Sequence, residues 1–334
     1  MSASGGTKAV VAALSANGFI AICKFGGWAL TGASSMLAEA IHSVADCGNQ
    51  VLLLVGGKRA RRAADEEHPF GYGRERYVFS FMVAIILFSL GGLFALYEAY
   101  HKLEEVLHPD PEHAGDNLLT SPWWWVPVVI LSAALVAEGL SLRTAVKESN
   151  PLRGQQSWWR FIKTAKAPEL PVILLEDIGA LLGLVFALLG VGLSLITQNL
   201  VFDVFGTAMI GLLLVAIAVV LAWETKSLLL GEAASKQSVG RISRAIIGAE
   251  GVERLIHMKT LHLGPEEVLV AAKIAVDRTD SAAEVAEIIN RTEGRIRDAE
   301  PMVTALYLEP DIYRENYTAP QRPDRTAEAG EAHE

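Results

Sequence analysis

The chain has 334 residues, of which 51% are hydrophobic and 20% are charged, and its formal net charge at pH 7 is −9. A protein that binds a nucleic-acid duplex is usually basic, so this charge argues against nucleic acid as a partner. The two cysteines, Cys23 and Cys47, are too few for a disulfide framework or a thiolate zinc finger.

Long stretches without Lys, Arg, Asp or Glu dominate the first 230 residues. Four of them reach about the 20 residues that a helix needs to cross hydrocarbon, and two further apolar stretches are interrupted by charge. Core helices of soluble proteins seldom run so far without a charge. We therefore predict an all-α membrane domain of six transmembrane helices over residues 1–230, and not a large soluble α-protein. The predicted spans are 9–30, 35–57, 77–100, 122–142, 170–196 and 203–228.

Lys and Arg collect in the loops on one side of these spans. The second loop, the fourth loop and the segment after the last span are basic, whereas the third loop is acidic. The loops near Gly32 and Asn199 carry no basic residue. By the positive-inside rule we expect both termini to be cytoplasmic, or on the equivalent face of an organelle. The plasma (inner) membrane is the expected location of this multi-pass protein.

After about residue 230 the sequence resembles that of a soluble domain. Apolar positions at helical spacing alternate with short β-like runs, in the order helix, strand, strand, helix, strand. The helices are predicted at 235–249 and 281–299, and the strands at 254–263, 268–276 and 303–308. This order predicts a small cytoplasmic α+β (αββαβ) domain over residues 231–311. Residues 312–334, rich in Pro, Glu, Asp and Arg, are predicted to be a disordered tail.

One face of the second predicted span carries Glu39, His42, Asp46, Asn49 and Gln50. At about 100° per residue these side chains fall within an arc of roughly 100°. His42 and Asp46 are four residues apart, so an imidazole nitrogen and a carboxylate can reach the same cation. Charged groups inside a membrane are expensive and mark function by default, although polar residues also hydrogen-bond between helices. Glu39, close to the outer end, could simply face water.

A second intramembrane pair, Glu176 and Asp177, lies in the fifth span. Adjacent side chains diverge by about 100°, so both cannot point squarely at one site. Asp177 is followed by 25 residues without Lys, Arg, Asp or Glu, which places it well inside the span. A salt bridge to Lys24 of the first span, or a position at a helix start, would be a purely structural role for Asp177.

Depth counting in two antiparallel spans puts Asp177 within a turn or two of His42 and Asp46. We expect these three residues, with Glu176 as an additional ligand, to bind a divalent metal cation near the middle of the membrane. Oxygen and nitrogen ligands without cysteine suit Zn²⁺, but also Mn²⁺, Fe²⁺ or Co²⁺.

Asp65 and His68 lie in a Gly- and Pro-rich turn before the third span. They could also bind a metal, but so short a loop motif is a weak signal, and a solvated turn is the preferred interpretation.

Together these motifs resemble the cation diffusion facilitator family. The resemblance covers about residues 8–310 and is carried by the six-span order, the α+β domain, His42-x-x-x-Asp46, the fifth-span carboxylate and the loop His68-Pro-Phe-Gly-Tyr-Gly-Arg74. The stretch from Thr31 to Asp46, with Leu175-Glu-Asp177, is most similar to the zinc transporter nine branch. The resemblance implies a homodimeric exporter that exchanges Zn²⁺ for H⁺.

The chain departs from the family pattern inside the membrane and in the loop. The position four residues before the fifth-span aspartate is usually a ligand, and it is Ile173 in this chain. Glu176, Asn49 or water would then complete a tetrahedral shell. The loop has Tyr72 where the family usually has a histidine, which weakens metal binding there.

The cytoplasmic domain departs from the pattern as well. Zinc-sensing members carry a histidine-rich site for two metals in this domain. Here His257 remains, but the matching strand positions are Lys273, Tyr307 and Glu309. The domain is therefore expected to dimerise without binding zinc.

We predict a secondary active transporter, and not an enzyme, that moves a divalent cation, with zinc as first choice, in exchange for protons by alternating access. Imidazole titrates near neutral pH, so metal and proton can displace each other at His42. The expected partners are the metal cation, protons, the lipid bilayer and a second copy of the chain, with no cofactor besides the transported ion. The alternatives are a divalent-cation channel and a non-transporting regulatory membrane protein. An intramembrane metalloenzyme would be indicated by an HExxH helix, which the sequence lacks.

Overall fold

The structure is a computed structural model and describes residues 3–108 and 118–315. The chain separates into two compact units, Met1–Ala233 with Leu261–Val268 and Ala234–Thr260 with Leu269–Glu334. The domain limits at residues 230 and 311 stay predictions. Most of the predicted disordered tail, residues 316–334, lies outside the described residues.

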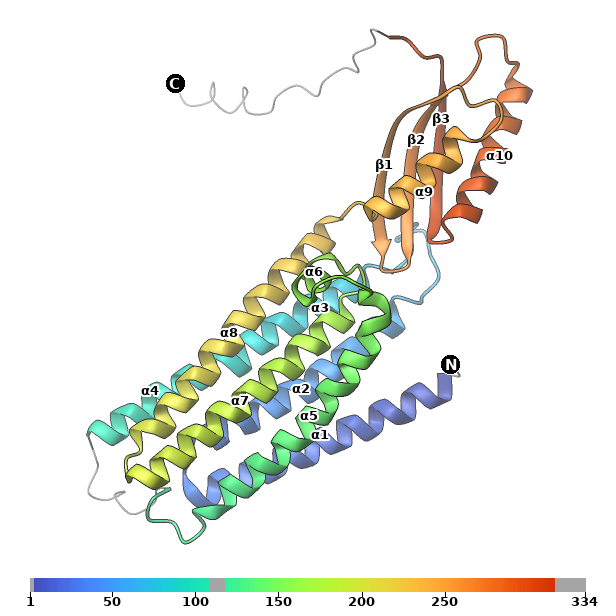
Figure 1. The fold of residues 1–334 in the computed structure, drawn as a ribbon. Helices are drawn as coiled ribbons and strands as arrows, with labels where there is room; N and C mark the ends of the chain where they lie inside the picture. The colour runs from blue at the N-terminus through green and yellow to red at the C-terminus, as the bar shows by residue number, and fades with distance from the viewer. Residues whose placement is uncertain (1–2, 109–117, 316–334) are drawn as a thin grey trace, which may run out of the picture. The chain divides into compact units, whose positions relative to one another are not determined.

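The first unit is built from long helices (Figure 1). They are α1 (Ala3–Thr31), α2 (Ser34–Arg59), α3 (Glu75–Ile86), η1 (Leu87–Leu93), α4 (Phe94–Leu107), α5 (Trp125–Arg153), α6 (Trp158–Thr164), α7 (Glu169–Thr197) and α8 (Val201–Leu230). The segments α3, η1 and α4 form one continuous helix, in which η1 is a π-helical stretch. The core of each predicted span therefore lies in one long helix. The short helix α6 was not predicted, because seven residues are too few for a periodic pattern.

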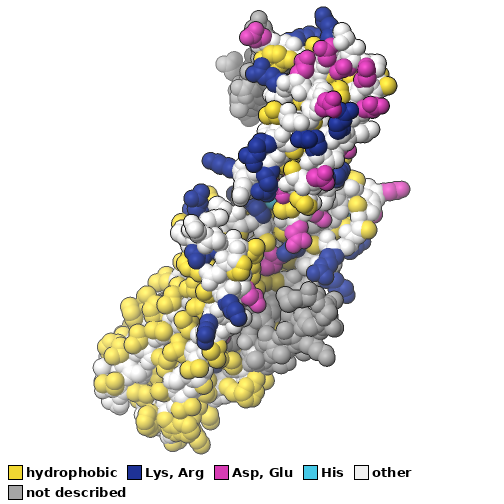
Figure 2. Space-filling model, turned by 45° about the vertical axis from the view of Figure 1, so that its right-hand side comes forward, with side chains coloured by type: hydrophobic (Ala, Val, Ile, Leu, Met, Phe, Trp, Pro, Cys, Tyr) yellow, Lys and Arg dark blue, Asp and Glu magenta, His cyan; other side chains and the backbone are white. Residues whose placement is uncertain are grey.

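Four helices of the described residues are long and apolar enough to cross a membrane: Glu75–Leu107, Trp125–Arg153, Glu169–Thr197 and Val201–Leu230. Helices α1 and α2 are of similar length, and α2 is less apolar because it carries the polar stripe. Large apolar side chains face outward from several helices, and the lower surface in Figure 2 is almost continuously yellow. Exposed apolar patches of soluble proteins rarely exceed a few hundred Å². The chain is a multi-pass integral membrane protein, and the predicted helical membrane domain is confirmed.

Helices α7 and α8 come close together at two glycines, Gly190 and Gly206. A Cβ atom on Gly190 would lie 3.0 Å from the carbonyl oxygen of Phe202, and one on Gly206 would lie 2.8 Å from that of Phe186. Small residues at such positions let the backbones of membrane helices come into direct contact. Any larger side chain at either position would push α7 and α8 apart.

The second unit contains α9 (Lys236–Ile247), α10 (Ala282–Ala299), β3 (Val303–Asp311) and most of β1 (Arg254–Gly264) and β2 (Glu267–Ala275), whose joined ends, Leu261–Val268, belong to the first unit. The sheet order is β1-β2-β3. A tight turn joins β1 to β2, and α10 connects β2 to β3 (Figure 1). Ser235 and Ser281 cap the two helices, and Ser281 forms a capping box with Glu284. Buried apolar residues of both helices, including Ile242 and Ile296, form the core with the strands. The predicted αββαβ order is confirmed.

Candidate metal centre

The polar stripe of α2 is buried inside the helical unit. The helix packs against α1, α3, α7 and α8. The His42 side chain is 1% exposed, Asp46 is 6% exposed and Asn49 is fully covered. His42 Nδ1 lies 3.6 Å from Asp46 Oδ1, which is too long for a hydrogen bond but close enough for an electrostatic contact. The predicted i, i+4 pair therefore shares one face of α2.

Glu176 brings α7 to this stripe. The side-chain amide of Asn49 donates a hydrogen bond of 2.6 Å to Glu176 Oε1. The carboxyl groups of Asp46 and Glu176 are also close enough to share a hydrogen bond. Two carboxyl groups and one imidazole from two antiparallel helices thus meet in a buried polar cluster.

Asp177 points away from this cluster. The hydroxyl group of Ser141, on α5, donates to both carboxylate oxygens of Asp177 at 3.3 and 3.2 Å. The divergence of about 100° between adjacent helical residues explains why Glu176 faces α2 while Asp177 faces α5. The structure therefore brings His42, Asp46 and Glu176 together and leaves Asp177 outside. Metal binding by any of the four stays a prediction.

The alternative salt bridge between Asp177 and Lys24 is wrong, because Lys24 binds Glu39. Its ammonium nitrogen lies 2.8 Å from Glu39 Oε2. The suggestion that Glu39 faces water is also wrong, since its side chain is fully buried. Counting residues along α2 gave the depth of Glu39 but not the helix packed against it.

Several polar atoms of the cluster are buried without a hydrogen-bond partner in the described part of the chain. They are His42 Nδ1 and Nε2, Asp46 Oδ1, Asn49 Oδ1 and Gln50 Oε1. Leaving a buried polar group unpaired costs about 1–3 kcal/mol, so each such atom calls for an explanation, such as a bound ion or water. The chemistry of these donors, imidazole nitrogen and carboxylate oxygen, fits Zn²⁺ and similar divalent cations.

The donors do not form a ready-made coordination shell. Among the residues that the structure describes, no group of three or more His, Cys, Asp or Glu side chains is arranged to hold a metal ion. A transported ion differs in this respect from a structural one, because it must be released. A shell of three or more of these donors around one cation would require α2 and α7 to come closer together.

The π-helical segment of the third span lies against the imidazole. A Cβ atom on Gly91 would lie 3.9 Å from His42 Nδ1 and 3.1 Å from Leu214 Cδ1. π-Helical turns are rare and occur frequently at functional sites. Gly91 therefore leaves room beside the ring at the place where the helix is irregular.

Two acidic residues of the membrane domain were not singled out from the sequence. Glu138 of α5 interacts electrostatically with His42, Asp46 and Asp177. It was overlooked because it lies near the end of a long apolar run, although a single carboxylate inside a predicted span is itself a signal. Glu138 adds negative charge to the surroundings of the cluster.

The second overlooked residue, Asp203, has a structural role at the start of α2. Its Oδ2 accepts hydrogen bonds from the backbone N–H of Ser34 at 2.9 Å and from the Ser34 hydroxyl at 3.1 Å, and its Oδ1 accepts from Ser35. A carboxylate at a helix N-terminus satisfies free N–H groups and complements the helix dipole. Asp203 thus fastens α8 to the first turn of α2.

The turn that contains Asp65 and His68 uses its polar groups internally. Tyr72 donates a hydrogen bond of 2.6 Å to Asp65 Oδ2, and the backbone N–H of His68 donates one of 2.7 Å to Oδ1. These bonds, the first above all, hold the pKa of Asp65 below its usual value. Asp65 therefore has a structural reason for its position, and metal binding in this loop stays an untested possibility.

Comparison with known proteins places this chain in a family. Residues 10–230 match the model of the cation efflux transmembrane domain. The human protein named "Proton-coupled zinc antiporter SLC30A9, mitochondrial" (Homo sapiens) is 32% identical over 272 residues, which are 81% of this chain and 46% of that protein. Metal tolerance protein C4 of Arabidopsis thaliana is 28% identical over 269 residues, which are 80% of this chain and 56% of that protein. The chain spans about half the length of these curated relatives.

A solved structure of MamM-CTD covers 23% of this chain and 98% of its own, at 18% identity and a TM-score of 0.23, and so low a score supports no conclusion. The family match, by contrast, covers well over half of the chain. The chain belongs to the cation efflux family, which is the cation diffusion facilitator family of the sequence resemblance, near the zinc transporter nine branch.

Proposed function

We propose that the protein is a secondary active transporter that moves a divalent metal cation, with zinc as first choice, across a membrane in exchange for protons. The observation that carries this proposal is the buried cluster of His42, Asp46 and Glu176, in which both imidazole nitrogens lack a hydrogen-bond partner in the described chain. Buried ionisable groups inside a membrane domain mark ion pathways by default.

The coupling to protons follows from the chemistry of the cluster. An imidazole must be neutral to bind a metal, so a proton and a cation compete for His42. The human relative is named a proton-coupled zinc antiporter, which supports both the metal and the counter-ion. The relatives are named as transport or tolerance proteins, which supports a transporter and not an enzyme.

Alternating access requires that the cation meet ligands from helices that can move relative to each other. His42 and Asp46 lie on α2, whereas Glu176 lies on α7. A small change in the distance between these two helices would complete or open the shell. The site would then open to one side of the membrane or to the other through a rocking movement of the helices about it.

We further propose that the chain is a homodimer joined through its cytoplasmic domain without a zinc site there. Lys273 occupies a strand position that is a ligand in zinc-sensing relatives, and its ammonium group lies 2.9 Å from Asp311 and 3.0 Å from Glu309. These hydrogen bonds, the one to Asp311 first, raise the pKa of Lys273. The positive charge of Lys273 at this position disfavours the binding of a metal cation there.

Both termini are proposed to face the cytoplasm, because the basic loops lie on their side of the membrane. The plasma (inner) membrane is the proposed host. The human relative carries "mitochondrial" in its name.

The test is zinc uptake into proteoliposomes that contain the purified full chain and an internal pH dye. We expect saturable zinc flux with proton movement in the opposite direction, lost in His42→Ala and kept in His101→Ala, whose side chain is 53% exposed on α4. Unsaturable flux without proton movement would favour a channel. Zinc binding without flux would favour a non-transporting regulatory protein, which is the alternative that the incomplete shell supports.

A further inference from the structure

Lys24 is a buried cation next to the candidate metal centre. It lies on α1, its side chain is 1% exposed, and its ammonium nitrogen contacts three oxygen atoms of α2. The distances are 2.8 Å to Glu39 Oε2, 2.8 Å to Ser43 Oγ and 3.4 Å to the Glu39 carbonyl oxygen. An ammonium group has three donors, so Lys24 is held in one position by α2.

Glu39 joins this pair to a third helix. One of its oxygens accepts from Lys24, and the other, Oε1, has no hydrogen-bond partner in the described residues. A Cβ atom on Gly183 of α7 would lie only 2.6 Å from Glu39 Oε1. The carboxylate therefore fills the space beside a glycine of the helix that also supplies Glu176.

Stability is a weak reason for such a pair. Removing two charges from water often costs more than their attraction returns, and the cost is high inside a membrane. Glu39 lies three residues before His42, close to one helical turn along the same stripe. The charge of Lys24 acts on His42, Asp46 and Glu138. The Lys24–Glu39 pair is therefore of interest for its position beside the candidate metal centre, and not for its contribution to folding.

We propose that the Lys24–Glu39 pair sets the affinity of the site for the transported divalent cation. Lys24 is a fixed internal cation that repels the metal, and Glu39 balances that repulsion and keeps the ammonium group in place. Neither is a ligand. The inference rests on the proposed function, and it adds to it two buried opposite charges whose balance fixes the affinity of the site for its cation.

The electrostatic argument predicts opposite effects of the two single substitutions. Lys24→Met leaves the negative charge of Glu39 beside the site and should tighten zinc binding, whereas Glu39→Gln leaves the positive charge of Lys24 and should weaken it. In a medium of effective dielectric constant about 20, one unit charge near a divalent ion changes the dissociation constant by at least about tenfold. A pair with a purely structural role would give a loss in both variants.

The experiment measures zinc affinity by isothermal titration, and zinc flux in proteoliposomes, for the full chain. The variants are K24M, E39Q, the double variant K24M/E39Q and the conservative K24R. Lys102→Gln is the matched control, because Lys102 lies on α4 and pairs with Glu105 there. All titrations are made at the same pH.

We expect tighter binding with slower turnover in K24M and weaker binding in E39Q. The double variant and K24R should return to within about threefold of the wild type, since the net charge beside the site is unchanged. If K24M does not fold, weak binding in E39Q that is restored in the double variant supports the proposal equally. Shifts of the same sign in both single variants, or no shift in either while the wild type binds and transports zinc, would overturn it. A wild type that neither binds nor transports zinc would instead overturn the proposed function, and this inference with it.

Discussion

Asn49 donates a hydrogen bond of 2.6 Å to Glu176, which links the polar stripe of α2 directly to α7. It orients the Glu176 carboxyl group toward Asp46 and away from the neighbouring Asp177, which binds Ser141. The two adjacent acids of α7 therefore have different surroundings, and their substitution should have different consequences.

Glu176→Gln should reduce zinc affinity and flux by roughly 10–100-fold, as is typical when a ligand or its immediate support is removed. Asp177→Asn should change both by less than about threefold, because its partner Ser141 can hydrogen-bond to an amide as well. Zinc titration and flux assays on the two isosteric variants check this. Inactivation by D177N with a mild effect of E176Q would restore the assignment made from the sequence.

Gly91 leaves the space beside the His42 ring, and filling it should impair transport. The Cβ atom of Gly91→Ala would press on Leu214 at 3.1 Å. Such overpacking typically costs about 1–3 kcal/mol, and the added methyl group would also occupy the space 3.9 Å from His42 Nδ1. Gly192→Ala on α7 is the matched control, because nothing lies within 4 Å of its Cβ position. We expect lower zinc flux in G91A and normal flux in G192A, and equal flux in the two would contradict a role for the π-helical segment.

Asp203 should matter for stability and not for zinc affinity. Asp203→Ala removes the bonds to Ser34 and Ser35 that cap α2. Losing a helix cap costs about 0.5–2 kcal/mol, so the melting temperature in detergent should fall by several degrees. Zinc titration at a temperature well below the transition should give the wild-type affinity. A D203A variant that is stable but does not bind zinc would place Asp203 in the site.

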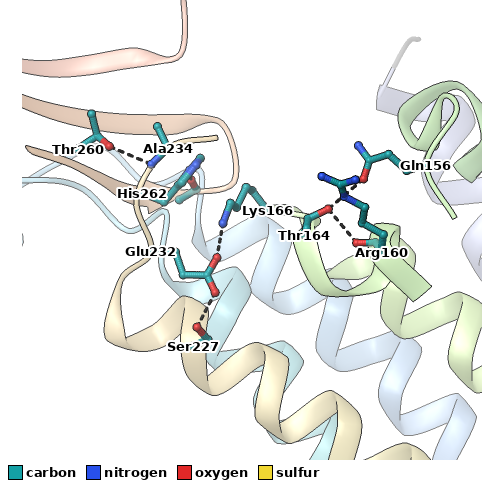
Figure 3. A network of polar contacts seen from close by, with 10 residues as sticks. Gln156, Arg160, Thr164, Lys166, Ser227, Glu232, Ala234, Thr260 and His262 are labelled. Atoms are coloured by element: carbon teal, nitrogen blue, oxygen red, sulfur yellow. Dashed lines mark hydrogen bonds and ion pairs between the residues drawn. The ribbon is translucent and has the colours of Figure 1, made fainter. Parts of the chain in front are cut away.

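The junction after α8 offers a prediction on pH. Glu232 accepts hydrogen bonds from Lys166 and, at 2.5 Å, from Ser227 (Figure 3). Burial raises the pKa of Glu232, but the bonds from Lys166 and Ser227 outweigh it and leave the pKa below the ordinary glutamate value of 4.5. A lowered pKa in the folded state means that the contribution to stability is complete above pH 4.5 and is lost as the pH falls through the folded-state pKa.

Glu232→Gln should therefore lower the free energy of unfolding by less than about 1 kcal/mol at neutral pH, because the pair is partly exposed and screened by solvent. The difference from the wild type should shrink as the pH falls through the folded-state pKa of Glu232. Denaturant unfolding at several pH values measures both. A difference that grows on acidification would mean that the pKa is raised and not lowered.

The cytoplasmic domain should hold the dimer together without metal. Light scattering of the full chain in detergent should give the same dimer mass with and without a chelator, because Lys273 is engaged by Glu309 and Asp311 at the position where relatives use a ligand. Dissociation into protomers on chelation would point to a bridging zinc ion.

The sequence was sufficient for the long helices of the membrane domain because the membrane imposes a strict rule on them. A charge inside hydrocarbon is costly, so uncharged runs marked the spans, and the charges that interrupted α2 marked its polar face. The strands and helices of residues 235–311 followed from apolar periods of two and of three to four residues.

The rotation of each helix about its axis could not be predicted in the same way. The choice between Glu176 and Asp177 depends on whether α2 or α5 packs on a given side of α7, and the sequence of α7 alone is apolar on both sides. The partner of Lys24 posed the same problem, since Glu39 and Asp177 were both at a plausible depth. The depth of a residue in the membrane follows from counting residues along its helix, whereas the direction in which its side chain points depends on tertiary packing.

The contact between Gly190 and Gly206 limits how the membrane helices can move. Because the backbones of α7 and α8 touch here without side chains between them, the two helices cannot slide past each other by changing side-chain rotamers. We therefore expect α7 and α8 to tilt together as one rigid unit. Asp203, near the start of α8, accepts a hydrogen bond from the first turn of α2, so we expect this end of the helices to stay in place during the tilt. If the protein transports by the rocking movement proposed above, we expect the opposite ends of α2 and α7 to separate, with His42, Asp46 and Glu176 between the fixed end and the opening.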